Sequence, residues 1–237
     1  MTKDQTGTAL ITAQLRSDYV FRPARGPARE FWVLLHGYEL SGAFMMQKLA
    51  GCFPDDVALL APNGPFPVPR RKSDGAYRVG FAWYFWDPRV DQYYVGMDAA
   101  FTLIAQLVRE KNLAGVPLNI LGYSQGGYLA PFVAAHLASL AGHPSSGPEI
   151  PSVKRMIGVA ADFLTDEVPA LPGVEIDWVL GLADEVVEAP GVQRHLAALR
   201  TAGATLREHL LPGQGHLISS QMTEALRAIV AKSTGTR

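Results

Sequence analysis

Short apolar runs alternate with longer amphipathic runs along most of the 237-residue chain. Several short runs are rich in leucine and β-branched residues without strict alternation, which is typical of strands buried on both faces. Strands that alternate with helices favour an α/β fold, a mostly parallel sheet with helices on both faces. The expected strands are 18–22, 31–36, 57–61, 118–122, 155–159, 176–180 and 205–210, and the expected helices are 42–52, 92–111, 125–140, 191–201 and 218–232.

Length and composition describe an ordinary globular chain, which we expect to form one domain over residues 1–237. Hydrophobic residues make up 48%, charged residues 18%, and the net charge is −1, so nothing predicts binding to nucleic acid. The single cysteine, Cys52, excludes an internal disulfide, and no CxxC pattern supports a metal site. No signal-peptide or membrane-spanning run is present, so we expect a cytoplasmic protein without integral membrane association.

Ser124 carries the strongest chemical signal. The segment Gly122-Tyr123-Ser124-Gln125-Gly126 fits the pattern G-x-S-x-G, between a strand-like and a helix-like run. Such a strand-to-helix turn is strained, and glycines on both sides remove Cβ atoms that would clash. The alternative is a glycine-rich turn that binds an anion or only packs tightly.

A serine nucleophile needs a base, and the base needs a carboxylate to orient it. Of the six histidines, His216 lies in a glycine-rich loop after the last expected strand. In hydrolases whose serine lies in a G-x-S-x-G turn, the base lies at this place in the chain order. Asp184 follows the preceding strand and gives the chain order Ser, Asp, His. Asp162 also follows a strand and is the rival acid.

An acyl-transfer intermediate needs hydrogen-bond donors for its oxyanion. We expect one donor to be the backbone N–H of Gln125 and the other to be that of Tyr38, in the loop after the early strand 31–36. In this interpretation His36 supports the loop and is not a base. The simpler alternative is a plain strand-end histidine.

With these motifs the chain resembles the α/β-hydrolase superfamily, and within it the phospholipase/carboxylesterase group that includes the acyl-protein thioesterases. The resemblance covers about residues 31–230 and is most specific in Tyr123-Ser124-Gln125-Gly126-Gly127. It implies hydrolysis of carboxylic esters or thioesters by a Ser124–His216–Asp184 triad, with no cofactor. One departure is Glu39, where the group usually has a glycine; we expect its carboxylate to point to solvent or to pair with a base.

Aromatic residues gather between residues 81 and 94, which hold seven of the chain's 22. We expect Trp83, Tyr84, Phe85 and Trp86 to bind an apolar acyl or aryl group, in an aromatic-rich insertion at about 64–95 near the active site. The alternative is a satellite hydrophobic cluster under a long loop at 62–80. The basic residues at 70–72 are expected to form a solvated face of that loop.

The sequence therefore predicts a serine carboxylesterase that acts on small-molecule esters, thioesters or lysophospholipids. Two alternatives remain open: a ligand-binding protein of the same fold without turnover, and an acyltransferase in which an alcohol replaces water. Helices and edge strands could support a homodimer, but no surface patch is diagnostic.

Overall fold

The computed structural model describes residues 14–87, 89–141, 149–163, 169–201 and 203–232. Its centre is a seven-stranded sheet with the strand order β1-β3-β2-β8-β9-β10-β11, in which only β1 runs antiparallel to its neighbour. This sheet confirms the predicted mostly parallel architecture. Its strands are β1 (Tyr19–Arg22), β2 (Glu30–Leu35), β3 (Val57–Pro62), β8 (Leu118–Tyr123), β9 (Val153–Val159), β10 (Glu175–Gly181) and β11 (Thr205–Leu211).

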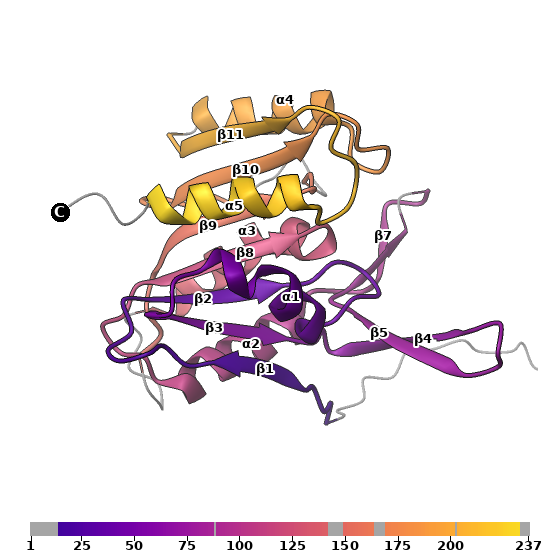
Figure 1. The fold of residues 1–237 in the computed structure, drawn as a ribbon, viewed down its shortest axis with the longest axis horizontal. Helices are drawn as coiled ribbons and strands as arrows, with labels where there is room; N and C mark the ends of the chain where they lie inside the picture. The colour runs from indigo at the N-terminus through magenta and orange to yellow at the C-terminus, as the bar shows by residue number, and fades with distance from the viewer. Residues whose placement is uncertain (1–13, 88, 142–148, 164–168, 202, 233–237) are drawn as a thin grey trace, which may run out of the picture.

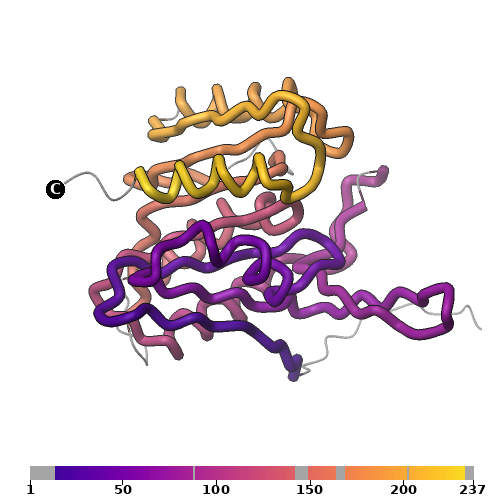
Figure 2. Tube along the Cα trace, viewed as in Figure 1, coloured from indigo at the N-terminus to yellow at the C-terminus, as the bar shows by residue number. Residues whose placement is uncertain are grey.

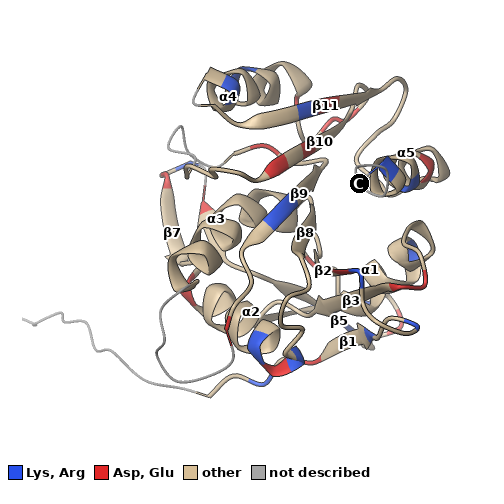
Figure 3. Cartoon of the chain, turned by 90° about the vertical axis from the view of Figure 1, so that its left-hand side faces the viewer, with Lys and Arg blue, Asp and Glu red and all other residues tan. Residues whose placement is uncertain are grey.

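Helices cover both faces of the sheet, because alternate residues of each central strand point to opposite sides and most of them on both sides are apolar. In β2, Phe31 and Val33 pack with helices α2, α3 and α4, whereas Trp32 and Leu34 pack with α1 and α5. Figure 3 shows α2 and α3 on one side of the sheet and α1 and α5 on the other. The helices are α1 (Gly42–Leu49), followed by a short 3-10 turn (Ala50–Cys52), α2 (Asp98–Lys111), α3 (Gln125–Leu140), α4 (Ala189–Thr201) and α5 (Ser220–Lys232).

Two small antiparallel sheets correct the sequence prediction. The stretch expected as a long loop at 62–80 contains most of a hairpin, β4 (Phe66–Arg71) with β5 (Tyr77–Ala82). The helix expected at 92–111 begins only at Asp98, because residues 92–95 form β7 (Gln92–Val95), which pairs with β6 (Phe85–Asp87). Figures 1 and 2 show both small sheets beyond the carboxyl ends of the main parallel strands.

The carboxyl ends of the parallel strands share one edge, since Tyr123 pairs with Val159 and Val159 with Val179. The segments after β2, β8, β9, β10 and β11 therefore emerge on the same side, where such sheets bind ligands. Within the described ranges, every helix is too short or too polar to cross a bilayer.

Candidate active site

Ser124 sits on a strained turn between β8 and α3. Its φ of 50° and ψ of −122° lie outside the regions that an ordinary serine occupies. Its N–H donates to the Val159 carbonyl at 2.9 Å, which ties the turn to β9. A Cβ at Gly122 would lie 2.1 Å from the Gly126 carbonyl oxygen, and one at Gly126 would lie 2.3 Å from a β2 carbonyl. Glycine is thus required on both sides of the serine for steric reasons, as a nucleophile elbow demands.

His216 lies between Ser124 and Asp184. Its Nε2 is 2.9 Å from Ser124 Oγ, and its Nδ1 is 2.8 Å from Asp184 Oδ2. Because a carboxylate only accepts, the Nδ1 proton donates to Asp184, which leaves Nε2 to accept the serine hydroxyl proton. The other carboxylate oxygen accepts from the N–H groups of Val186 and Val187, at 2.8 and 2.9 Å. The Asp184 side chain is 1% exposed, so these hydrogen bonds replace its hydration.

Asp162, the rival acid, is hydrogen-bonded to a different histidine. Its Oδ1 lies 2.8 Å from Nδ1 of His195 on α4, and His216 is not its partner. The structure thus brings Ser124, His216 and Asp184 together and gives Asp162 a different histidine. The Phe163 ring stands edge-on to that histidine, with centroids 5.7 Å apart.

The loop that carries His216 is held by side chains that the sequence patterns did not reveal. Gln214 is 3% exposed, and its Nε2 donates to the Gly215 and Leu217 carbonyls at 2.6 and 2.8 Å. Tyr123, next to the nucleophile, donates its hydroxyl to the His216 carbonyl at 3.2 Å, and the two rings lie 5.6 Å apart. Burial, together with the charge of Asp184, raises the pKa of Tyr123 to about 12, so this hydroxyl keeps its proton at neutral pH.

Two backbone N–H groups are available near Ser124. Gln125 is the first residue of α3, and first-turn N–H groups have no partner inside their helix. Tyr38 lies in a turn closed by Leu40 N–H to the Gly37 carbonyl at 3.1 Å, and its own N–H has no backbone partner in the described part of the chain. The positive end of the α3 dipole adds to the attraction that this edge exerts on an anion.

Glu39, the residue after Tyr38, forms an ion pair. Its carboxylate pairs with Arg70 of the β4–β5 hairpin, with Oε2 2.5 Å from Nε. The expectation that Glu39 would pair with a base is confirmed. Arg70, one of the basic residues expected on the solvated face of the loop, forms this ion pair. Glu39 has a φ of 61°, a left-handed conformation that glycine adopts without penalty.

His36 is buried and neutral. The Gly64 N–H donates to its Nε2 at 2.8 Å, so Nδ1 carries the proton and donates to the Gly37 carbonyl at 2.7 Å. Burial lowers the pKa of His36 to about 4. The ring therefore supports the Tyr38 loop and has no free nitrogen with which to act as a base.

Trp83, which we expected to bind the substrate, lies in the core. It is fully buried, its ring packs 4.7 Å from that of His36, and its Nε1 donates to the His36 carbonyl at 2.8 Å. The Gln125 side chain holds the same segment, because it accepts from Trp83 N–H at 3.0 Å and donates to the Tyr84 carbonyl at 2.9 Å. Trp83 thus belongs to the core beneath the site, where a ligand does not reach it.

A cavity of about 560 Å³ opens beside Ser124. Three predicted aromatic residues line it, and the sequence missed Tyr128 and Phe163 as lining residues because they come from a helix and from the segment after β9. Among the described residues its lining is Tyr38, Tyr84, Phe85, Trp86, Ser124, Gln125, Tyr128, Asp162 and Phe163.

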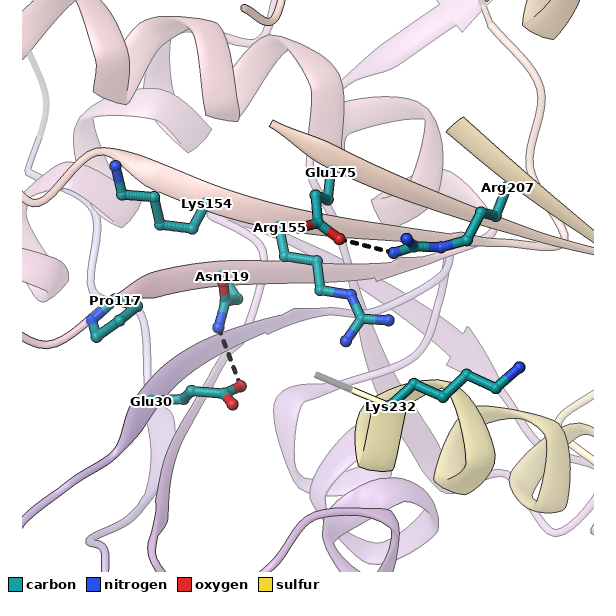
Figure 4. Close-up of a pocket in the computed structure, with 8 residues that line it drawn as sticks. All are labelled: Glu30, Pro117, Asn119, Lys154, Arg155, Glu175, Arg207 and Lys232. Atoms are coloured by element: carbon teal, nitrogen blue, oxygen red, sulfur yellow. Dashed lines mark hydrogen bonds and ion pairs between the residues drawn. The ribbon is translucent and has the colours of Figure 1, made fainter. Parts of the chain in front are cut away.

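A second cavity, of about 440 Å³, lies at the opposite, amino ends of the strands. Figure 4 shows Arg155 and Lys232 beside it, with Asn119 bonded to Glu30 and Glu175 to Arg207. Its described lining residues include no serine, and they lie at the end of the strands opposite to Ser124. In the part of the chain that the structure describes, no three His, Cys, Asp or Glu side chains gather as metal ligands would.

Solved structures share this architecture over almost the whole chain. They include Zea mays acyl-protein thioesterase 2 (TM-score 0.69, 20% identity, 94% of this chain and 100% of that one) and esterase PE8 (0.66, 22%, 93% and 99%). A carboxylesterase from Mesorhizobium loti is also similar, with a TM-score of 0.61 and 24% identity over 86% of this chain and 89% of that one. The fold is therefore that of the α/β-hydrolase superfamily, as the sequence motifs implied.

The family follows from the sequence itself. The model of the serine hydrolase (FSH1) family matches residues 32–224, a span that contains the Ser124, Asp184 and His216 positions. The chain belongs to the FSH1 serine hydrolase family. A comparison with curated proteins finds no match.

Proposed function

We propose that this serine hydrolase is a carboxylic-ester hydrolase, with Ser124 as nucleophile, His216 as base and Asp184 as the carboxylate that orients the base. The observation that carries the proposal is the hydrogen-bond chain through both nitrogens of His216, at 2.9 and 2.8 Å. A histidine fixed in this way accepts the serine proton from the correct ring nitrogen.

The reaction proceeds through an acyl-enzyme. Ser124 Oγ attacks the substrate carbonyl while its proton moves to His216 Nε2, and the N–H groups of Tyr38 and Gln125 hold the oxyanion. His216 then protonates the leaving alcohol or thiol. Water attacks the acyl-enzyme with His216 again as base, which releases the acid and restores Ser124.

The position of Glu39 supports turnover over a purely ligand-binding role. A carboxylate beside the oxyanion donors would oppose the negative intermediate, but this one pairs with Arg70. The names of the structural neighbours, which include an acyl-protein thioesterase and esterases, agree with an ester or thioester substrate. The aromatic lining of the cavity suits a small organic molecule.

The test is covalent labelling with a fluorophosphonate, read as intact mass, together with hydrolysis of p-nitrophenyl esters. We expect one adduct on the wild type, none on Ser124→Ala, and a loss of turnover of about 10⁴-fold or more in that variant. Ser139→Ala is the matched control, because Ser139 is an exposed serine on the same helix α3.

Both variants should keep the wild-type circular dichroism spectrum, so that a lost adduct reports chemistry and not unfolding. A folded wild-type protein that forms no adduct would overturn the proposed mechanism. An adduct that persists in Ser124→Ala would assign the nucleophile to another residue.

A further inference from the structure

The cavity beside Ser124 combines many aromatic rings with a single carboxylate. Six side chains supply rings, and Asp162 supplies the charge. No lysine or arginine occurs among the described lining residues. The six rings are those of Tyr38, Tyr84, Phe85, Trp86, Tyr128 and Phe163.

Asp162 lines this cavity, and its second carboxylate oxygen lies beside Gly191 at the start of α4. Its Oδ1 is bonded to His195, whereas Oδ2 accepts no hydrogen bond from the residues that the structure describes. Its side chain is 23% exposed, so it is partly shielded from water and still reachable. Burial and the charge of Asp162 raise the pKa of Tyr128 to about 12, which is consistent with a carboxylate that acts on this cavity.

The phenolic rings add no charge of their own to the cavity. Burial also raises the pKa of Tyr84 well above its ordinary value, so both tyrosines remain neutral at any physiological pH. An apolar substrate that filled the cavity would strip water from the carboxylate without replacing it, which is unfavourable. An organic cation would instead meet the carboxylate and the negative faces of the rings together.

We propose that the preferred substrates are esters that carry a compact organic cation, a quaternary or tertiary ammonium group, next to the scissile bond. This inference rests on the proposed esterase function and adds the class of substrate. In this proposal Asp162 and the aromatic rings of the lining determine specificity, because they would contact the ammonium group and not the reacting carbonyl.

The decisive comparison uses ester pairs that differ only in charge. Choline butyrate is compared with 3,3-dimethylbutyl butyrate, in which carbon replaces the quaternary nitrogen. Phenyl 4-(trimethylammonio)butanoate and phenyl 5,5-dimethylhexanoate place the same difference in the acyl part. We expect kcat/KM to favour the cation by about tenfold or more in at least one pair, mostly through KM.

Two variants separate the carboxylate from general charge effects. Asp162→Asn should reduce the preference for the cation at least about fivefold, whereas Glu185→Gln, which removes an exposed carboxylate outside the cavity lining, should leave it unchanged. Assays at pH 8 keep ordinary imidazoles neutral. Tetramethylammonium should also slow fluorophosphonate labelling of the wild type more than that of Asp162→Asn.

The outcomes distinguish the two proposals. If Ser124 is labelled and the neutral esters are hydrolysed as well as the cationic ones, or better, the inference about the cation is wrong and the esterase stands. Loss of labelling on folded protein would overturn the esterase and this inference with it. An unchanged preference in Asp162→Asn would also overturn the role of that residue.

Discussion

A histidine–aspartate pair occurs toward each end of the parallel sheet, and of these two pairs only the one at the carboxyl end reaches a serine. At the carboxyl end His216 lies 2.8 Å from Asp184, and at the amino end His209 lies 2.8 Å from Asp177. The distance is the same, so it does not identify a catalytic pair. The difference is that the second nitrogen of His216 reaches the hydroxyl of Ser124.

The amino end is instead a closed network of ion pairs. Asp177 accepts from Arg155 at 2.6 Å and from Arg207 at 2.9 Å as well as from His209, and it is 1% exposed. A carboxylate that is shared among three cationic or ionisable partners is held in its charged form, so it has no proton to exchange. The cavities at the two ends are of similar size, about 440 and 560 Å³, so cavity size does not mark the active site either.

The largest expected effect comes from replacing each histidine in turn. His216→Gln should lower kcat by about 10⁴- to 10⁶-fold, because Ser124 loses its base. His209→Gln should leave kcat within about threefold, because that imidazole is hydrogen-bonded to Asp177 and not to Ser124 or Asp184. Steady-state kinetics on both variants, with circular dichroism as the folding check, measures this contrast. A His209→Gln enzyme that folds but has lost its activity would contradict it.

A second comparison separates the two aspartates at the carboxyl end. Asp184→Asn should lower kcat by about 10³- to 10⁴-fold for every ester, because the amide no longer fixes the imidazole tautomer. Asp162→Asn should act mainly on KM, and mainly for cationic esters, since Asp162 lines the cavity and its histidine partner is His195. Measuring kcat and KM separately for both variants shows which aspartate orients the base. The assignment of the acid would be reversed if Asp162→Asn gave the larger loss of kcat.

The amino end should matter for stability. Asp177→Asn leaves the buried Arg155 guanidinium without its counter-charge, which should lower the free energy of unfolding by about 3–5 kcal/mol at pH 7. Glu175→Gln is the control; it removes an exposed carboxylate that pairs with Arg207 and should cost less than about 1 kcal/mol. Urea denaturation measures both values.

The same carboxylate predicts a pH dependence. Burial alone would raise the pKa of Asp177, but hydrogen bonds from His209, Arg207 and Arg155 outweigh it and hold that pKa well below its ordinary range. A depressed carboxyl pKa contributes stability that is complete above the unfolded-state value of about 4 and is lost as the pH falls below it. The difference in stability between wild type and Asp177→Asn should therefore shrink from pH 7 to pH 3. A constant difference would refute this explanation.

The sequence predicted the main sheet well because buried parallel strands and their helices have strong local signals. All seven main strands lie within about two residues of their predicted bounds, and α3 (Gln125–Leu140) has the predicted ones. The β4–β5 hairpin was missed because Pro67 and Pro69 argue against a strand. They are two residues apart, so their missing N–H groups lie on the same edge of β4, where a two-stranded sheet needs no partner.

Candidate site residues were predictable where chain order alone places them at strand ends, as for Ser124, Asp184 and His216. Contacts made by side chains across the fold were not. Trp83 was misplaced because a dense run of aromatics does not reveal which rings point inward. The side chains of Gln125 and Gln214 fix loops through hydrogen bonds to residues that only the tertiary structure brings near.

The smallest expected effect concerns Glu39, at the rim of the carboxyl end. Glu39→Gln keeps the left-handed backbone and loses only an ion pair whose arginine is 69% exposed, so stability should change by less than about 0.5 kcal/mol. Glu39→Gly also relieves the left-handed strain, about 1–2 kcal/mol, against about 0.5–1 kcal/mol of extra unfolded-chain entropy. The glycine variant should therefore be about 0.5 kcal/mol more stable than the glutamine variant by urea denaturation.

The kinetics of these two variants test the electrostatics of the oxyanion site. Because the Glu39 carboxylate is turned to Arg70, removing it should change kcat/KM by less than about threefold. A tenfold rise in Glu39→Gln would mean that the carboxylate opposes the oxyanion despite its ion pair. The rim charge would then act on the reaction, as the proposed catalytic centre beside it does, and not only on structure, as the charges at the amino end of the sheet do.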